Sequence, residues 1–402
     1  MREEPSASLA ALRANLAWAA EQGMSIRGQL DPRELEALAG VFAGHAPWDF
    51  ALYEPLRAFA HALPRLALPD LPAPLTFGDV LLAIDELRAE TTPAWPTSPG
   101  VGARTRAALG YAGASAGITR LHEAHPRPWR EHGRDNKAFL VRAAEVATVS
   151  SVAVVGAGKL YDIPLAELVA RFSRVVLIDV DGEALEQSVS EAELAPGARA
   201  RVELVCADVT GINDTFLVGA EEVFACADED EVVARLLAFL HRYRIAAPPR
   251  LFSEELGAVD VACSSMVLSQ LAIPLNRHLE GRFQERFPQS QRFASPPVQV
   301  ALGQFTQRLQ LAHLRALLAA APRAVLTTDV AETFTAVDPQ GNVVRTSARL
   351  SLIGAPLLAD LVPAHGMRAS STASWTWRRV VPTPARPHGC TLDVEGVVLD
   401  RV

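Results

Sequence analysis

The sequence lacks most of the features that mark secreted, membrane-spanning or zinc-binding proteins. Its four cysteines include no Cys-x-x-Cys pair, so their spacing predicts neither a disulfide framework nor a zinc site. No run of about 18 uncharged apolar residues occurs, which excludes a typical membrane-spanning helix. The first residues, MREEPSAS, include acidic side chains where a signal peptide has an apolar stretch. We therefore expect a cytoplasmic protein without a membrane partner and without a bound metal.

Positive charge is also scarce. Lysine and arginine together number 38 against 46 acidic residues, which gives a formal net charge of −8. Lys137 and Lys159 are the only lysines. A surface of negative sign repels phosphate backbones, so we expect no nucleic-acid partner and favour a small-molecule substrate. The oligomeric state stays open, with a homodimer as one option.

Apolar residues are abundant and make up 49% of the 402 residues. A chain of this length is expected to form two or three folding units. Residues 1–145 show apolar side chains at helical spacing, interrupted by proline-rich stretches at 64–74 and 93–99. We expect residues 1–145 to form a helical domain that caps the site, and residues 146–402 to form a second domain.

The pattern changes at residue 150, where short apolar runs alternate with helical stretches. Such runs are typical of parallel strands buried on both faces, and they predict a doubly wound α/β core over residues 150–330. Residues 331–402 are expected to add antiparallel strands, beginning with a hairpin whose turn spans 338–342. The predicted core elements are strands over 152–155, 175–178, 202–206, 259–263 and 324–327, an inserted helix over 231–243 and a long helix over 298–321.

The most informative segment is the first strand with the turn after it, VAVVGAGKLYDIPLAEL. Gly156 and Gly158 allow a sharp turn whose backbone approaches a ligand at a helix N-terminus. Asp179 ends the second strand, where a carboxylate can accept both hydroxyls of a ribose. Asp208 follows the third strand, where a carboxylate can accept from an adenine amino group. Tyr161 stands where a dinucleotide-binding fingerprint has its third glycine, which disfavours NAD.

Five segments together resemble the class I S-adenosylmethionine-dependent methyltransferases. They are VVGAG at 154–158, LIDVD at 177–181, CADV at 206–209, VDVACSS at 259–265 and PRAVLTTD at 322–329. The resemblance implies a Rossmann-like methyltransferase sheet and S-adenosylmethionine as the cofactor. It also implies that Asp179, or Asp181 in its place, holds the ribose and that Asp208 and Val209 frame the adenine. The residues expected to bind the cofactor are Gly156, Ala157, Gly158, Lys159, Tyr161, Asp162, Asp179, Val180, Asp181, Asp208, Val209 and Ser264.

The methionine end of the expected site departs from the family's pattern. The family places an acidic residue two positions before the first glycine, and this chain has Val154 there. We expect Tyr161 and Asp162 to make those contacts instead. Lys159 either pairs with the cofactor carboxylate or is a solvated loop lysine. Ser264 either contacts a ligand or caps the helix that follows.

The expected reaction is methyl transfer to an N, O, S or C nucleophile of a small molecule. It needs alignment and, for some acceptors, a base, so no fixed catalytic motif is required. The candidates are Tyr161, His278 as a general base, and His132, which would close the pocket from the segment 121–137. His278 at a solvated helix end, and 121–137 as an exposed linker, are the plainer alternatives. For the whole chain, the alternatives are aminocarboxypropyl transfer from the same cofactor, an NAD(P)-dependent oxidoreductase, and a non-enzymatic scaffold.

Overall fold

The computed structural model describes residues 103–145, 150–243, 245, 259–350 and 367–401, all within one compact unit. Of the helical domain expected over residues 1–145, only residues 103–145 lie in this range, and they form three helices. The helices expected before residue 103 lie outside the described residues.

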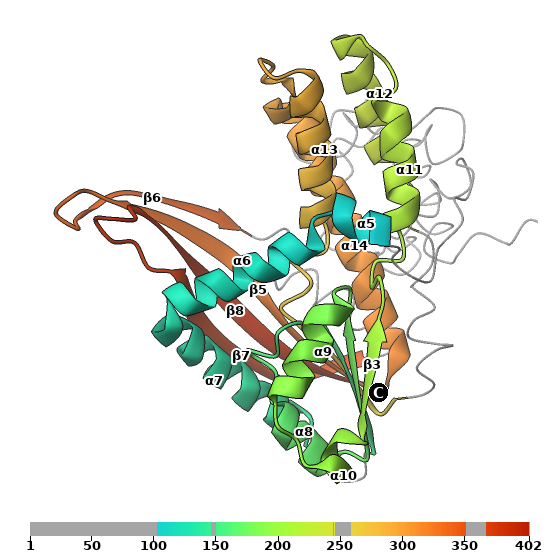
Figure 1. Ribbon diagram of the computed structural model, residues 1–402, viewed down its shortest axis with the longest axis vertical. Coiled ribbons are helices and arrows are strands. Elements are labelled where there is room, and N and C mark those ends of the chain that lie inside the picture. The colour runs from blue at the N-terminus through green and yellow to red at the C-terminus, as the bar shows by residue number, and fades with distance from the viewer. Residues whose placement is uncertain (1–102, 146–149, 244, 246–258, 351–366, 402) are drawn as a thin grey trace, which may run out of the picture. The chain divides into compact units, whose positions relative to one another are not determined.

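The described strands form one sheet with the order β3-β2-β1-β4-β5-β8-β7, and β6 pairs with β5 (Figure 1). Strands β1 to β5 run parallel, whereas β6, β7 and β8 pair antiparallel with their neighbours. Every residue of β1 and β4 is buried. This is the doubly wound α/β architecture that the sequence predicts. The strands are β1 (Ser151–Val155), β2 (Arg174–Asp179), β3 (Val202–Cys206), β4 (Val261–Ser265), β5 (Arg323–Val337), β6 (Val343–Leu350), β7 (Met367–Val380) and β8 (His388–Arg401).

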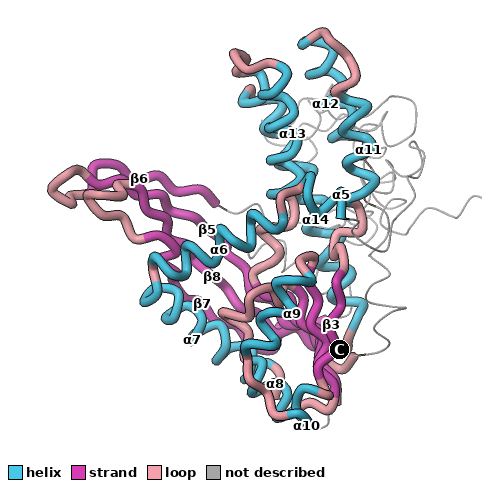
Figure 2. The backbone as a smooth tube through the Cα atoms, in the orientation of Figure 1, coloured by secondary structure: helices cyan, strands magenta, loops and turns pink. Residues whose placement is uncertain are grey.

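Helices pack on the parallel strands and extend beyond them. The helices are α5 (Ala103–Ala108), α6 (Tyr111–Ala124), α7 (Pro126–Ala143), α8 (Leu165–Arg171), α9 (Gly182–Glu191), α10 (Pro196–Arg199), α11 (Asn213–Val223), α12 (Glu229–Arg242), α13 (Ile273–Arg286) and α14 (Pro296–Ala320). Helices α8 and α9 pack against β2, and α14 packs against β4 and β5. Figure 2 shows α11, α12 and α13 standing together beyond the sheet.

Most expected core elements are confirmed, including the inserted helix α12 and the long helix α14. One alternative is wrong. Ser264 and Ser265 do not cap the following helix, because β4 continues through both and pairs with β5 at Leu326 and Thr327. Both serine side chains are buried in the sheet.

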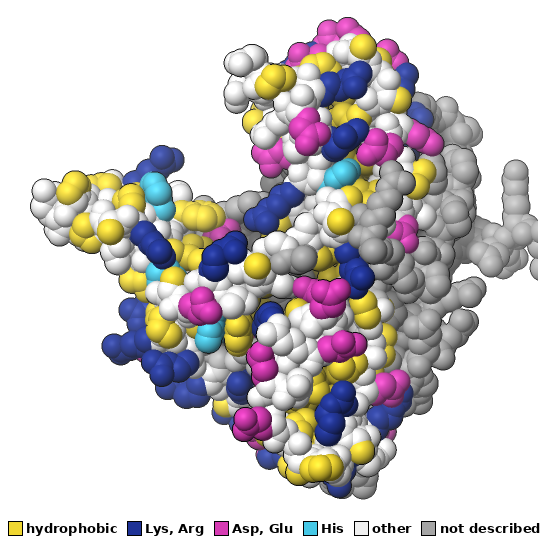
Figure 3. All heavy atoms as spheres, viewed as in Figure 1, with side chains coloured by type: hydrophobic (Ala, Val, Ile, Leu, Met, Phe, Trp, Pro, Cys, Tyr) yellow, Lys and Arg dark blue, Asp and Glu magenta, His cyan; other side chains and the backbone are white. Residues whose placement is uncertain are grey.

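The exposed linker considered for residues 121–137 is also wrong. Pro126 is the first residue of α7, a position where proline sacrifices no hydrogen bond. Helix α7 packs against β7 and buries Trp129 and His132. Its outer face carries Arg127 and Arg134, whose side chains are 80% and 72% exposed, and basic side chains gather over this part of the surface (Figure 3).

Strands β5 to β8 continue past the end of β4 as an antiparallel extension (Figure 1). A β-bulge interrupts the β5–β8 pairing between Asp329 and Ala331. The predicted hairpin is confirmed between β5 and β6. Its turn is closed by Asp338, whose Oδ1 accepts from the backbone N–H groups of Gln340 (2.9 Å) and Asn342 (2.8 Å).

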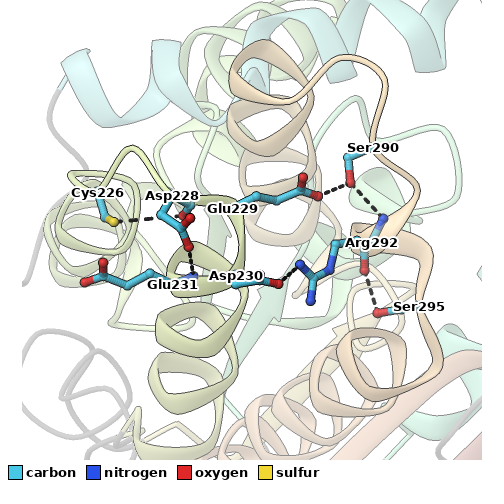
Figure 4. Close-up of polar contacts among 8 residues, drawn as sticks. All are labelled: Cys226, Asp228, Glu229, Asp230, Glu231, Ser290, Arg292 and Ser295. Carbon is cyan, nitrogen blue, oxygen red and sulfur yellow. Dashed lines mark hydrogen bonds and ion pairs between the residues drawn. The ribbon is translucent and has the colours of Figure 1, made fainter.

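The first turn of α12 is fixed to the chain that precedes α14 (Figure 4). Asp228 caps the helix by accepting from the backbone N–H of Glu231 at 2.9 Å. Glu229 accepts from the Ser290 hydroxyl, and Asp230 pairs with Arg292. Acidic side chains at this end also suit the positive end of the helix dipole.

No described helix is long and apolar enough to cross a membrane. Within the same residues, no group of three or more His, Cys, Asp or Glu side chains is placed to hold a metal ion.

We predict that Asp260 stabilises the fold in a pH-dependent way. Its Oδ2 accepts from the backbone N–H groups of Ser150 and Ser151, both at 2.8 Å, and thereby holds the start of β1 beside β4. These donors lower the pKa of Asp260. The stabilisation is therefore complete above the unfolded pKa of about 3.9 and is lost as pH falls through the lower folded pKa.

Asp260→Asn should lower the free energy of unfolding by about 1 kcal/mol at pH 7. Urea unfolding between pH 3 and 7 should show that the difference in the free energy of unfolding between the variant and the natural protein disappears below about pH 4. Asp393→Asn, at an exposed position on β8, is the control. A difference in the free energy of unfolding that does not change with pH contradicts this role for Asp260.

Candidate active site

The candidate site lies at the carboxyl ends of β1 to β4. The chain leaves β1 between its neighbours β2 and β4, which lie on opposite sides of it. In open α/β sheets such a switch point leaves a crevice for ligands. The loop that follows β1, residues 156–163, crosses this edge and carries both glycines of the motif.

Backbone conformation requires the two glycines of this loop. Gly156 has φ 77° and Gly158 has φ 41°, values in the left-handed region that side chains disfavour. A Cβ atom at Gly156 would also lie 1.8 Å from Cγ2 of Val267, in the loop after β4. The loop after β1 and the loop after β4 are therefore packed directly on each other.

Asp179, at the end of β2, joins the glycine loop to the second strand. Its Oδ2 accepts from the Gly158 N–H at 2.9 Å, and its Oδ1 accepts from the Asp181 N–H at 2.9 Å. Burial raises the pKa of Asp179, and the backbone N–H groups of Asp181, Gly158 and Val180 oppose that rise. Since a carboxylate has about four acceptor sites, it keeps capacity for a further donor. The carboxylate can therefore accept from a ligand hydroxyl.

Asp208, after β3, lies deeper than expected. Its side chain is buried, and its oxygens accept from the backbone N–H groups of Thr210 and Asn213, both at 2.8 Å. Burial raises the pKa of Asp208. These contacts fix the start of α11, and the neighbouring Val209 is half-buried.

Helix α6 covers this edge with one face. The phenol of Tyr111 accepts from Asn213 at 2.9 Å, and the Ser115 hydroxyl donates to Asp181. Burial raises the pKa of Tyr111, and the charges of Asp208 and Asp179 add to the rise. The phenol therefore lies close to the acidic ends of β2 and β3.

Further along α6, Thr119 and His122 contact Tyr161 of the glycine loop. The His122 ring stacks on the Tyr161 ring with centroids 4.0 Å apart, and the Tyr161 hydroxyl lies 3.5 Å from Thr119 Oγ1. The sequence analysis expected helices here but assigned none of these α6 residues to the site, although Tyr111, Ser115, Thr119 and His122 recur at the spacing of one helix face, which was the available signal.

Helix α7 holds the loop from the opposite side. Asn136 Nδ2 donates to the backbone O of Asp162 at 3.0 Å and to Ser265 Oγ at 2.9 Å. Gly133 permits the close approach, because a Cβ there would lie 2.9 Å from the backbone O of Tyr161. Asn136 is fully buried, and its Oδ1 accepts from no donor among the described residues.

His132 is buried beside Asp162 in a fixed orientation. Trp375 donates from Nε1 to His132 Nδ1 at 3.0 Å, and Trp377 stacks on the imidazole with centroids 4.0 Å apart. A neutral imidazole that accepts at Nδ1 carries its proton on Nε2. His132 Nε2 lies 3.8 Å from Asp162 Oδ2, and the Asp162 side chain is 21% exposed.

The other predicted residues lie apart from this centre. Lys159 is bonded to Gln187 at 2.9 Å on the surface side of the loop. Ser264 lies inside the sheet with its Oγ 2.9 Å from His313 Nε2, and burial lowers the pKa of His313 to about 4. Burial lowers the pKa of His278 as well; its neighbours belong to α5, α11 and α13.

Comparison with protein families finds no match, and comparison with curated proteins finds none. Comparison with solved structures finds a similarity to the CcbJ methyltransferase from Streptomyces caelestis. The two chains are 12% identical, the match covers 67% of this chain and 96% of that chain, and the TM-score is 0.33. A candidate RNA methyltransferase from Pyrococcus horikoshii has 10% identity, coverage of 67% and 83%, and a TM-score of 0.31. The glycopeptide N-methyltransferase MtfA with S-adenosylmethionine has 9% identity, coverage of 65% and 93%, and a TM-score of 0.27.

We predict that Trp375 selects the His132 tautomer. Trp375→Phe removes the donor to Nδ1, a hydrogen bond that favours the natural tautomer by about 1 kcal/mol. The second neutral tautomer should then be populated and be visible in the ¹⁵N shifts of the imidazole. Trp129→Phe is the matched control, because Trp129 donates to the backbone O of Arg379 instead. An unchanged His132 spectrum in Trp375→Phe contradicts the assignment.

The strand order, the glycine turn after β1 and the antiparallel strands at one edge give the described chain a doubly wound, Rossmann-like α/β fold.

Proposed function

We propose that this chain is an S-adenosylmethionine-dependent methyltransferase with a small-molecule acceptor. The observation that carries the proposal is the link between Gly158 and Asp179. It places a half-buried carboxylate beside a glycine backbone, with acceptor capacity left for a further donor. A ribose diol offers two donors at matching separation, and the glycine backbone leaves room for the rest of the cofactor.

The residues at the other end of the loop fit the methionine part of this cofactor. The apolar side chain of Val154 is fully buried, and its strand lies between β2 and β4, so this position offers no polar group to a ligand. Asp162 supplies a partly exposed carboxylate instead, and His132 lies behind it. A carboxylate at this place suits an α-ammonium group.

Bound S-adenosylmethionine supplies a methyl group on a positively charged sulfur, which an aligned nucleophile displaces. The chain's own part is to orient both reactants and to exclude water. We assign His132 a positioning role, because its Nδ1 lone pair already accepts from Trp375. Its Nε2 lies 3.8 Å from Asp162 Oδ2, which is too long for a direct hydrogen bond but places the imidazole beside that carboxylate. Helix α6 covers the edge of the sheet, which favours an enclosed small molecule over a large acceptor.

Asp179→Asn tests the cofactor proposal. The variant should bind S-adenosylhomocysteine about tenfold or more weakly by calorimetry, the scale of one charge-assisted hydrogen bond. Asp230→Asn, in the first turn of α12, is the control and should bind normally. If the natural protein gives heat with NADH and none with S-adenosylmethionine or S-adenosylhomocysteine, the proposed function is wrong.

Asp162→Asn separates the two ends of the site. It should weaken S-adenosylhomocysteine about tenfold while leaving the affinity for adenosine, which has no methionine part, within about twofold. Asp179→Asn should weaken both ligands by similar factors. Equal losses of the two ligands in Asp162→Asn mean that Asp162 does not serve the methionine end.

A further inference from the structure

Helix α6 contains glycines that its packing does not require. A Cβ atom at Gly113 would meet no atom within 4 Å, and one at Gly117 would meet only the end of Arg120 at 3.9 Å. At Gly133 and Gly219, by contrast, a Cβ would lie 2.9 Å and 2.4 Å from neighbouring atoms. Glycine is the poorest helix former after proline. The glycines of α6 therefore weaken this helix without any gain in close packing.

The helix also has a conformational break at each end. Gly110 precedes it with φ 70°, and its side-chain position is likewise free of neighbours within 4 Å. No side chain caps the first turn. His125 follows the last turn with φ −133° and ψ 55°, and Pro126 then starts α7. These two residues separate α6 from the helices on either side.

The described hydrophobic core contacts α6 mainly through Leu121, which is half-buried against the cluster of Trp129 and Trp377. Among the α6 residues whose burial is described, all are intermediate or exposed, and Ile118 is 41% exposed. Helix α7, by comparison, buries seven residues. Besides Leu121, the inner face of α6 is attached by the hydrogen bonds of Tyr111 and Ser115 and by the stack of His122 on Tyr161. Elements with few buried apolar contacts open at low free energy.

We propose that α6 is a lid that opens and closes over the cofactor site and sets the rate at which ligands exchange. The identity of the exchanging ligand rests on the proposed function. The attachment points of the lid are Asp181 and Asn213 at the ends of β2 and β3, and Tyr161 in the glycine loop. Opening releases these three points together, and closure shields the site from water.

The experiment raises the helix propensity of α6 without adding a contact. In the double variant Gly113→Ala/Gly117→Ala, amide hydrogen exchange over residues 111–124 should slow tenfold or more. Stopped-flow mixing should show the association and dissociation rates of S-adenosylhomocysteine slowed by a similar factor, with the dissociation constant changed less than about threefold. Gly281→Ala in α13, also free of neighbours within 4 Å, is the matched control and should leave both ligand rates unchanged.

A second variant should favour the open state of the lid instead of the closed state. Tyr111→Phe removes the hydrogen bond to Asn213 at nearly equal helix propensity, and it should speed both amide exchange of α6 and ligand exchange. The lid is refuted if α6 amides exchange as slowly as those of α7 in the natural protein, or if the double variant slows amide exchange but not the ligand rates. A protein that binds no S-adenosylhomocysteine contradicts the proposed function, and α6 is then no cofactor lid.

Discussion

The hydrogen bond from the Gly158 N–H to the Asp179 carboxylate is the contact on which the site depends. It spans the carboxyl ends of β1 and β2, and it forms only because Gly158 adopts φ 41°. Asp179 also accepts from the Asp181 N–H, so one side chain sets the path of two loops. Burial raises the pKa of this carboxylate, and each backbone donor offsets part of the lost hydration. A ligand that binds there meets an acceptor whose position is already fixed.

Two helices from the segment before β1 complete the site, and they do so by different means. Helix α7 is anchored by a buried apolar face and by Asn136, which bonds both the glycine loop and β4. Helix α6 rests on polar contacts and contains glycines that packing does not explain. A firmly packed helix beside a weakly attached one suits a site that must hold a ligand precisely and still release it.

The sequence predicts the sheet well because its strands are local apolar runs that end at recognisable turns. The position of Asp179 follows from the same pattern, since a residue at the end of a parallel strand lies at the ligand-binding edge. Ser264 shows the limit of that reasoning. It also lies near a strand end, yet its side chain points to His313 inside the fold, and alternation along a fully buried strand does not reveal which face holds the site.

The contacts that the sequence analysis missed join residues far apart in the chain. Ser115 meets Asp181 across 66 positions, and Asn136 meets Ser265 across 129. No local propensity encodes such pairs. His132 illustrates a partial success: its place near the glycine loop was expected, but its fixed tautomer depends on Trp375, 243 residues away.

A crystal structure with S-adenosylhomocysteine bound tests the central claim most directly. The account predicts that both ribose hydroxyls donate to Asp179 while Gly158 N–H keeps its bond to Oδ2. A ligand bound elsewhere, or a ribose held without Asp179, would contradict it.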